Sequence, residues 1–437
     1  MSHAAHLSTA IDERTAQIGV IGLGYVGLPL ALEFAKAGFQ VTGFDLDGDK
    51  IRVLEQGGSY IEDVPADEVK AAIEAGKLRA TADFAALRET DIINVCVPTP
   101  LTRSKDPDLS HMQSAVREIQ GRLRPGQLVV LGSTTYPGTT HELYLPLLEE
   151  TRMKCGEDFF LAFAPERIDP GNTKFGVHDV PKVVGGETPE ATELACKIFG
   201  TVFDKTVPVT STQSAEMVKL LENTFRAINI GLANEVALMC DRLGLDVWEV
   251  IDAAATKPYG FMKFTPGPGL GGHCIPVDPT YLSWKMKSLG FNARFIELAT
   301  DINSGMPEHV VDKVTELLNQ ERLAVNGARV LLLGVAYKPD VADLRESPAL
   351  DIMQLLLDKG ADLRFHDPHV PEVGLDGRSL KGVELTDEEL AAADLVVIVT
   401  DHSAVDFDRV VDRAQRIFDT RNATRGVRDG REKIHKL

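Results

Sequence analysis

The sequence has few cysteines and no long apolar run. Its five cysteines are far apart and none shows CxxC spacing, which argues against a disulfide framework and against structural zinc. No apolar stretch approaches the roughly 18 residues of a membrane-spanning helix, and the N-terminus lacks the apolar segment of a signal peptide. We therefore predict a cytoplasmic protein without a membrane partner, in which residues 1–16 form a short mobile tail.

Positive charge is also scarce. Lysine and arginine number 46 against 65 aspartates and glutamates, so the net charge is −19. General binders of nucleic acid or of anionic membranes carry the opposite balance, so neither partner is expected. A few cations placed in a cleft can still bind an anionic substrate. The length of 437 residues predicts about two to four domains.

A strand–helix–strand pattern opens the ordered part of the chain. Apolar residues run continuously from Ile18 to Ile21, follow helical spacing from Leu28 to Ala37, and run continuously again from Phe39 to Phe44. These patterns predict a buried strand, a helix packed on one face, and a second buried strand. Such a unit is the first half of a doubly wound α/β domain.

The turn inside this unit carries a dinucleotide-binding fingerprint. Gly22, Gly24 and Gly27 form GxGxxG, whose glycines permit a tight turn, the approach of backbone to a pyrophosphate, and close helix–strand packing. Asp45 follows the last of these glycines by 18 residues, at the end of the second strand. A carboxylate there accepts from ribose hydroxyls and repels a 2′-phosphate. The pattern therefore predicts NAD rather than NADP, against the alternative of a glycine turn without a ligand.

Three further strands end in polar loops. Loops with Thr99, Thr134 and Glu166 follow the segments DIINVCV, QLVVLG and FFLAF. Ligands of doubly wound sheets bind beyond the carboxyl ends of the strands. The shared placement makes these residues candidates for a site, although each alone could be an ordinary loop residue.

A long helix is predicted from Ser214 to Leu243, because apolar residues recur there at helical spacing without proline. Such a helix could link two domains and form a dimer surface. Lys219 and Asn223 lie four residues apart and therefore on one face of it, either as part of a site or as an ordinary solvated pair.

The stretch GPGLGGHCIPVD places Cys274 in a glycine-rich loop, with Asp278 four residues later. The other four cysteines lie in or beside apolar segments and are expected to be packing residues. From the residues alone, Cys274 could be a disulfide partner, a metal ligand, a packing thiol or a nucleophile.

The last third repeats the strand–helix–strand logic, with a second strand ending at Asp367. Only Gly334 stands in its first turn, so we expect a Rossmann-like fold without a second dinucleotide. Lys338, Arg345 and Arg421 lie at strand ends, where they suit a phosphorylated ligand or are ordinary surface charges.

The whole chain is predicted to be α/β, with two Rossmann-like doubly wound domains joined by a long central helix and a small helical domain. The predicted bounds are 17–210, 211–320 and 321–437.

The ordered motifs of the chain resemble those of the UDP-glucose/GDP-mannose dehydrogenase family, the nucleotide-sugar 6-dehydrogenases. Between Gln17 and Asn422 these motifs are GLGYVGLPLA, VPTP, GSTTYPGTT, APER, AEMVKLLENTF, GPGLGGHCIPVDP, GVAYKPDVADLRESPA and FDTRN. The segments APERIDPG and ATKPYGFMKFTPGPGLGGHCIPVDPTYLSWK look most like the UDP-N-acetylglucosamine branch, with UDP-N-acetylmannosamine and UDP-glucose as alternative substrates.

The resemblance implies that the C6 hydroxymethyl of a nucleotide sugar is oxidised to a carboxylate with two NAD⁺ per sugar. A thiol adding to the C6 aldehyde gives a thiohemiacetal, then a thioester that water releases as the acid. The family also implies a role in surface polysaccharide biosynthesis. The long central helix makes a homodimer the natural minimum, with a higher homo-oligomer as the alternative. No metal is implied.

Each motif carries its expected roles by resemblance. Cys274 would be the nucleophile, while Lys219 and Asn223 steady the oxyanion. Asp278 with Thr134 would hold a water or take the first proton, and Glu166 would be the base for thioester hydrolysis. The residues expected to face NAD are Gly22, Gly24, Gly27, Asp45, Pro98, Thr99, Thr134 and Arg345. Those expected to face the UDP-sugar are Glu166, Lys219, Asn223, Gly271, Lys338 and Arg421.

The chain departs from the family pattern at two points. Pro170 stands where some members carry a second glutamate, so the role of that residue is lost or moved. No arginine lies between Leu243 and Ala293, where some members reach the neighbouring subunit's substrate, and Lys257 and Lys263 are the candidates to replace it. His273 matches no family role and is expected to be structural.

Two other classes of function compete with this interpretation. A hydroxyacid-type dehydrogenase would transfer one hydride per turnover, but it would not need Cys274 or a second α/β unit. A non-catalytic nucleotide-sugar sensor would bind without reaction, but it would not need Lys219, Asn223, Cys274 and Asp278 together.

Overall fold

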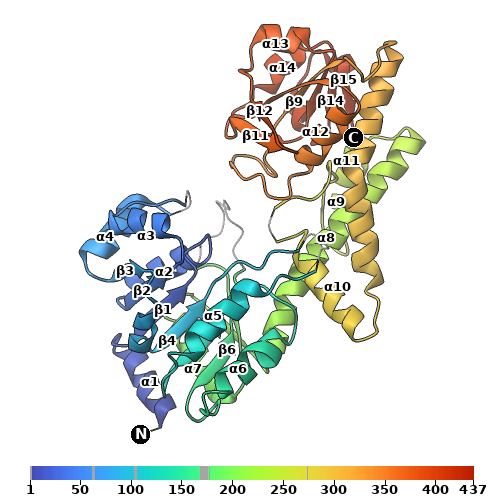
Figure 1. Ribbon diagram of the computed structural model, residues 1–437. Helices are drawn as coiled ribbons and strands as arrows, with labels where there is room; N and C mark the ends of the chain where they lie inside the picture. Colours follow the sequence, from blue (N-terminus) through green and yellow to red (C-terminus); the bar gives the residue numbers. More distant parts are fainter. Residues whose placement is uncertain (1, 62–63, 103–105, 168–175, 177, 273) are drawn as a thin grey trace. The chain divides into compact units, whose positions relative to one another are not determined.

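The computed structural model describes the whole chain except residues 1, 62–63, 103–105, 168–175, 177 and 273 (Figure 1). Pro170 and His273 therefore lie outside the described residues. The chain forms two compact units, Met1–Glu222 with Thr280–Gly290, and Asn223–Pro279 with Phe291–Leu437. The division into segments 17–210, 211–320 and 321–437 stays a prediction.

The first unit is built on an eight-stranded sheet in the described part of the chain, ordered β3-β2-β1-β4-β5-β6-β7-β8. Neighbouring strands run parallel except for β6 and β7. Their bounds are β1 Gln17–Ile21, β2 Gln40–Phe44, β3 Leu78–Thr81, β4 Ile92–Val95, β5 Leu128–Leu131, β6 Phe160–Phe163, β7 Lys182–Gly186 and β8 Thr206–Val209.

Helices cover both faces of this sheet, which explains why its central strands are apolar on both sides. Alternate residues of β5 enter different cores: Leu128 and Val130 join the helices α2 and α7, whereas Val129 and Leu131 join α5 and α6. The helical segments are α1 His3–Asp12, α2 Gly27–Lys36, α3 Gly48–Glu55, α4 Ala66–Glu74, η1 Phe84–Glu89, α5 Ser110–Gln120, η2 Thr140–Tyr144, α6 Leu145–Glu149 and α7 Pro189–Phe199.

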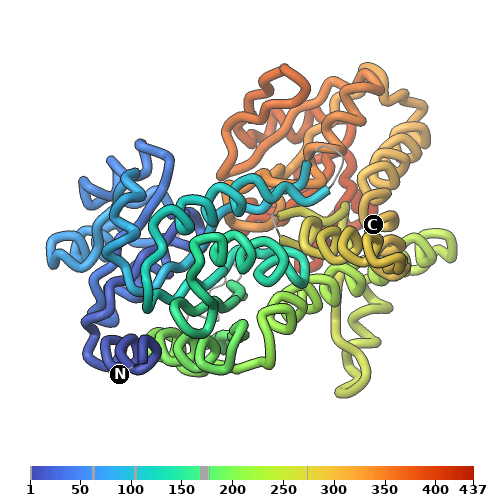
Figure 2. The backbone as a smooth tube through the Cα atoms, turned by 60° about the horizontal axis from the view of Figure 1, so that its bottom comes forward, coloured from blue at the N-terminus to red at the C-terminus, as the bar shows by residue number. Residues whose placement is uncertain are grey.

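The N-terminal segment is not a mobile tail, and that prediction was wrong for residues 3–12. They form α1, which lies alongside α7 (Figure 2). Leu7 and Ile11 are buried in the same core as α7. Lys197 of α7 pairs with Asp12 at 2.6 Å. Two apolar residues one helical turn apart are too short a pattern to distinguish a docked helix from a tail.

The long central helix is confirmed as α8, Thr212–Leu243. The second unit also contains α9 Val247–Ala255 and α11 Arg294–Gln320, and α10 Asp278–Ser288 follows the glycine-rich loop. Within that unit α8 and α11 approach closely, because a Cβ on Gly231 would lie 3.2 Å from the Cα of Ala299. Among the helices that the structure describes, none is both long and apolar enough to cross a bilayer.

A second parallel sheet, ordered β10-β9-β13-β14-β15, confirms the Rossmann-like unit predicted at the C-terminus. Its elements are β9 Arg329–Leu333, α12 Pro348–Asp358, β10 Asp362–His366, α13 Asp387–Ala392, β13 Leu395–Ile398, α14 Phe407–Arg413, β14 Ile417–Asp419, η3 Ala423–Gly426, η4 Arg431–Lys433 and β15 Ile434–Lys436. A hairpin, β11 Glu372–Leu375 with β12 Arg378–Lys381, stands beside it.

Asp367, directly after β10, is the hydrogen-bonding centre of this domain. Its carboxylate accepts at 2.7–3.0 Å from the backbone N–H groups of Val335, Ala336, His369 and Val370 and from Nε2 of His402. Burial alone would raise the pKa of Asp367, but these donors hold that pKa well below its ordinary value. The charged carboxylate therefore joins three strand-end loops.

We expect Asp367→Asn to lower the free energy of unfolding by about 3 kcal/mol, because buried donors lose a charged acceptor. A carboxylate whose pKa is depressed by folding stabilises the fold at pH values above its pKa in the unfolded chain, which is about 4. It loses that effect as the pH falls below this value. The wild type should therefore lose stability below about pH 4 more steeply than the variant.

Thermal unfolding measured across pH tests this prediction. Asp362→Asn is the matched control, since Asp362 is exposed at the other end of the same strand. Equal unfolding transitions for the two variants would contradict the role given to Asp367.

Candidate active site

The three fingerprint glycines are needed for three different reasons. Gly22 has φ +90°, and a Cβ there would lie 2.6 Å from the carbonyl oxygen of Cys96. A Cβ on Gly27 would lie 1.8 Å from the carbonyl oxygen of Gly22. A Cβ on Gly24, in contrast, would meet no described atom within 4 Å. The outer glycines thus close the turn, and the middle one leaves an open backbone cradle that suits a pyrophosphate.

Asp45 supports this turn from the end of β2. Its Oδ2 accepts from the N–H of Leu23 at 2.9 Å and lies 3.3 Å from Nζ of Lys50, and its Oδ1 accepts from the N–H of Asp47 at 3.0 Å. The carboxylate is therefore held at the strand end where a ribose would lie in this fold. Its contact with ribose hydroxyls stays a prediction.

Thr99, Thr134 and Glu166 follow β4, β5 and β6, which are neighbours in the sheet, so their loops share one edge. Ser133 joins the first two loops, because its Oγ donates to the carbonyl of Val97 at 2.8 Å. Thr99, which follows Pro98, is buried, and its carbonyl accepts from the hydroxyl of Tyr281 at 3.1 Å. The structure thus places the predicted loop residues together with the glycine turn.

Glu166 has both carboxylate oxygens engaged. Oε1 accepts from the N–H of Arg167 at 2.8 Å, and Oε2 lies 3.0 Å from Nζ of Lys182. Lys182 begins β7 and its side chain is only 3% exposed. Sequence reasoning missed this lysine, because a lysine at the start of a strand usually marks a surface end.

Glu216 was also missed. It is fully buried on α8, and its carboxylate accepts from the N–H of Gly138 and from N and Oγ1 of Thr140, the latter two at 2.9 and 2.6 Å. Burial raises the pKa of Glu216 to about 7. It ties α8 to the loop that follows Thr134. Its spacing of three residues from Lys219 was the available signal, since such residues share a helix face.

Three predicted site residues meet in the second unit. The carbonyl of Cys274 accepts from the N–H of Asp278 at 2.8 Å, and the buried carboxylate of Asp278 accepts from Nδ2 of Asn223. Lys219, 7% exposed, lies one turn before Asn223 on α8. The loop carrying the thiol is therefore fixed to the helix carrying the predicted oxyanion donors.

The cysteines differ in their surroundings. The structure describes all five, and none is in a disulfide. Burial raises the pKa values of Cys96 and Cys155 to about 12, which leaves them neutral packing thiols. Cys274 is partly exposed in its loop. The disulfide alternative is thereby wrong for Cys274.

The glycines of the Cys274 loop pack against the C-terminal sheet domain. A Cβ on Gly267 would lie 2.4 Å from the guanidinium of Arg421, and one on Gly271 would lie 2.6 Å from Cβ of Tyr337. A Cβ on Gly272, at φ +88°, would lie 2.8 Å from the Tyr337 ring. Contacts within the protein therefore favour glycine at these positions, a cause that the sequence analysis did not identify.

The three C-terminal cations have distinct settings. Arg421 donates through Nε to the carbonyl of Val399 at 2.9 Å, with its guanidinium against the glycine loop. Arg345 pairs with Asp343, with its NH2 group 2.6 Å from Oδ2. Lys338 lies 5.6 Å from the Tyr337 ring centre. Contacts of these cations with NAD or the UDP-sugar stay predictions.

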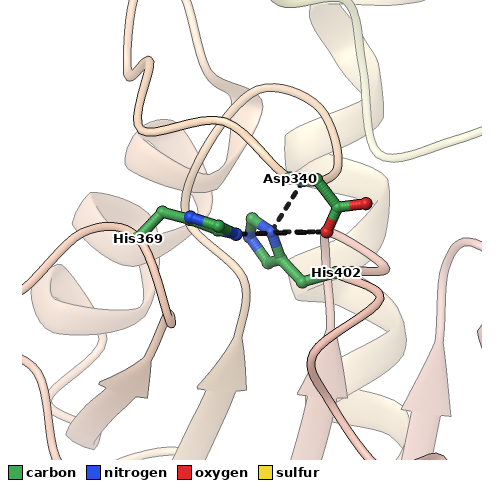
Figure 3. Close-up of side chains that lie close together, drawn as sticks. All are labelled: Asp340, His369 and His402. Atoms are coloured by element: carbon green, nitrogen blue, oxygen red, sulfur yellow. Dashed lines mark hydrogen bonds and ion pairs between the residues drawn. The ribbon is translucent and has the colours of Figure 1, made fainter. Parts of the chain in front are cut away.

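Asp340, His369 and His402 lie close together in the C-terminal domain, with one ligand atom of each within 4.8 Å of the others (Figure 3). His402 nevertheless has both ring nitrogens engaged: Nδ1 accepts from the N–H of Asp340 at 3.0 Å and Nε2 bonds Asp367 at 2.9 Å. A metal would have to displace one of these bonds, so the cluster is explained as a brace between loops, in which His402 is buried and Asp340 and His369 are exposed.

Three segments of the chain match the domains of one known protein family. Residues 16–203 match the NAD binding domain of the UDP-glucose/GDP-mannose dehydrogenase family, residues 213–305 its central domain, and residues 331–426 its UDP binding domain. The chain belongs to this family. Its N-terminal domain is therefore an NAD-binding domain, which confirms the cofactor predicted from the glycine turn.

Individual members of the family are similar over most of their length. The chain is 39% identical over 356 residues, 81% of this chain and 83% of the other, to UDP-N-acetyl-D-glucosamine 6-dehydrogenase of Pseudomonas aeruginosa. It is 36% identical over 387 residues, 88% and 89% of the two chains, to UDP-N-acetyl-D-mannosamine dehydrogenase of Pyrococcus horikoshii. A solved structure of UDP-D-ManNAc dehydrogenase from the latter organism has a TM-score of 0.84 at 34% identity, covering 93% and 96% of the chains.

Alanine at two of the fingerprint glycines should separate cofactor binding from folding. We expect Gly24→Ala to fold as the wild type and to bind NAD about tenfold or more weakly, because its methyl group occupies the open cradle. Gly27→Ala should instead lower the thermal unfolding temperature, since its Cβ would collide with the backbone of Gly22. Thermal unfolding and NAD titration of both variants test this. Unchanged NAD affinity in Gly24→Ala would remove the turn as the pyrophosphate site.

Proposed function

We propose that the protein oxidises the C6 hydroxymethyl of a UDP-N-acetylhexosamine to the carboxylate, with UDP-N-acetylglucosamine as the first candidate and UDP-N-acetylmannosamine as the alternative. The observation that carries the proposal is the contact of Asn223 with Asp278 beside Cys274. It brings a thiol, a carboxylate and an amide donor together from distant parts of the chain. The chain also matches the NAD binding and UDP binding domains of the family, which suit the cofactor and the nucleotide sugar that the reaction needs.

NAD supplies the hydride acceptor for each of the two oxidation steps. The turn formed by Gly22, Gly24 and Gly27 binds its pyrophosphate and Asp45 binds its ribose, with Pro98, Thr99, Thr134 and Arg345 completing the proposed set. Between the two oxidations the Cys274 thiolate adds to the C6 aldehyde, and the new C–S bond makes C6 a thiohemiacetal. Lys219 and Asn223 stabilise the negative charge on its oxygen, an effect that is large for a buried donor such as Lys219.

The second oxidation leaves a thioester on Cys274, which water must open. The water adds to C6 and gives a proton to Glu166, the C–S bond breaks, and Cys274 leaves as a thiolate. Asp278 with Thr134 holds a water or takes the first proton. Gly271, Lys338 and Arg421 bind the nucleotide sugar. Overall, one alcohol, two NAD⁺ and one water give one carboxylate, two NADH and three protons.

The competing functions lack a specific observation in their favour. A single-hydride hydroxyacid dehydrogenase or a non-catalytic sensor does not require the hydrogen-bonded arrangement at Cys274. The cytoplasmic location and the role in polysaccharide biosynthesis remain parts of the proposal.

The decisive measurement is NADH formed per sugar consumed, over a panel of UDP-GlcNAc, UDP-ManNAc, UDP-GalNAc, UDP-glucose and GDP-mannose. We expect two NADH with UDP-GlcNAc. Cys274→Ala should form no uronate and still bind NAD, because the thioester cannot form. Cys196→Ala, which changes a half-buried thiol of α7, is the control and should keep the wild-type ratio. Uronate formed at the wild-type rate by Cys274→Ala would falsify the mechanism.

We also propose a homodimer through the second-unit part of α8 and the start of α11. Phe225, Leu232 and Met239 recur every seven residues on α8 and are exposed, as is Phe295 on α11, at 75%. An apolar stripe of this kind on two adjoining helices is typical of a subunit interface. Lys257 and Lys263 remain the proposed substitutes for the inter-subunit arginine, although Lys263 is paired with Asp252 here.

Phe295→Asp tests the dimer. It should convert the dimer to a monomer at micromolar protein, because a carboxylate buried in an apolar interface has no counter-charge. Light scattering after gel filtration gives the mass. Leu323→Asp, which alters an exposed leucine beyond the end of α11, should leave the mass unchanged. A wild type that is monomeric, or a Phe295→Asp that stays dimeric, would contradict this interface.

A further inference from the structure

Lys182 is a buried cation in the NAD-binding domain that the proposed reaction leaves without a role. Its side chain is 3% exposed, and its Nζ lies 5.3 and 4.9 Å from the ring centres of Phe199 and Phe203. The only carboxylate that any described contact gives it is Glu166, at 3.0 Å. From the start of β7, the lysine side chain thus extends to the sheet edge, where its ammonium group pairs with the carboxylate of Glu166, the proposed hydrolytic base.

Stability alone does not explain such a pair. Removing two charges from water costs several kcal/mol per ion, and a buried salt bridge is often no more stabilising than apolar residues of similar volume. The two phenylalanine rings offset part of the cost through cation–π attraction. A lysine kept at this cost beside one particular carboxylate therefore indicates a function of that carboxylate.

Both oxygens of the Glu166 carboxylate are held in place. Oε2 is paired with Lys182 and Oε1 accepts from the N–H of Arg167. The guanidinium of Arg167 turns away from this carboxylate to Glu222, at 2.6 Å. Beside the pair, Cys96 is held neutral, because burial raises its pKa to about 12. Lys182 is therefore the cation that acts on Glu166 among these neighbours.

A small cavity completes the arrangement. It measures about 10 Å³, enough for about one water molecule, and Glu166, Lys182, Cys96 and Asn94 are among the residues that line it. Nδ2 of Asn94 is buried and has no hydrogen-bond partner among the described residues. One water there could satisfy this donor and contact the ion pair, which would hold Glu166 still further.

We propose that Lys182 is a positioning residue that orients Glu166 and keeps it ionised, so that it can take the proton of the water that opens the Cys274 thioester. This inference rests on the proposed function and adds a residue to it. Lys182 contacts neither the sugar nor the thiol in this role, and acts only through Glu166.

Lys182→Met is the test, with Lys182→Arg as the charge-conserving variant and Lys197→Met as the control. Lys197 is a lysine of the same domain whose ion pair, with Asp12, lies outside the site. In Lys182→Met, the loss of this one cation lets Glu166 hold a proton more tightly, so the acid limb of the pH–rate profile for uronate formation should move up by about one to two pH units. On that limb the rate should fall about tenfold or more, and KM for the sugar should stay unchanged.

The intermediate gives a second readout. Because hydrolysis is slowed and the two oxidations are not, acyl-enzyme on Cys274 should accumulate in Lys182→Met and be visible by intact-protein mass spectrometry after rapid acid quench. Lys182→Arg should restore the wild-type pH profile in large part, and Lys197→Met should match the wild type.

A double-mutant cycle covers the case in which Lys182→Met folds poorly. Glu166→Gln with Lys182→Met removes both charges, and it should be no slower in hydrolysis than Glu166→Gln alone, since Lys182 acts only through Glu166. An additive loss, or a wild-type pH profile in Lys182→Met, would overturn the inference. If the wild type itself forms no uronate from any sugar of the panel, the proposed function fails instead, and the two failures are thereby distinguished.

Discussion

The close packing of the Cys274 loop on the C-terminal domain is the constraint on which the candidate site depends. The N–H of Gly272 donates to the carbonyl of Arg345 at 2.9 Å, and the N–H of Gly267 donates to Oδ1 of Asn234 at 2.9 Å. A Cβ on Gly271 or Gly272 would collide with Tyr337, so a side chain there would disrupt this packing. A loop rich in glycine, which would be mobile in isolation, becomes fixed because backbone and ring atoms fill the space that side chains would take.

The same constraint explains a buried amide pair at the crossing of the two long helices. Asn234 of α8 donates to Asn303 of α11 at 2.8 Å, and its oxygen is the acceptor for the loop. Buried polar groups stabilise one arrangement only when every member is satisfied, so this chain of amides specifies how the loop meets both helices. The position of Cys274 thus follows from packing and hydrogen bonds that lie outside the reacting atoms.

Local patterns predicted the parts of the fold whose causes are local. The glycine turn, the strand ends at Asp45 and Asp367, and the helix from Ser214 onward follow from spacing over a few residues, and the structure has each of them. Asp45 and Asp367 also share a use that the sequence did not reveal, since both bind the first turn of their own domain. The buried partners of the site could not be predicted in this way. Lys182 meets Glu166 from 16 residues away and Glu216 meets Thr140 from 76, so only the sheet and helix packing brings them together.

Buried ionisable groups distinguish the loops that carry the proposed chemistry from the rest of the sheet edge. Glu216 holds the loop after Thr134 and Lys182 holds Glu166, whereas the glycine turn is held by Asp45, whose cationic partner Lys50 is 34% exposed. A turn that binds a dissociating cofactor must stay open, so its support can be partly exposed. A carboxylate that must accept a proton at one point of a reaction needs a fixed position and a fixed charge, and a low-dielectric setting makes a single nearby cation effective. The burial of Lys182 is therefore the property that fits it to its proposed task.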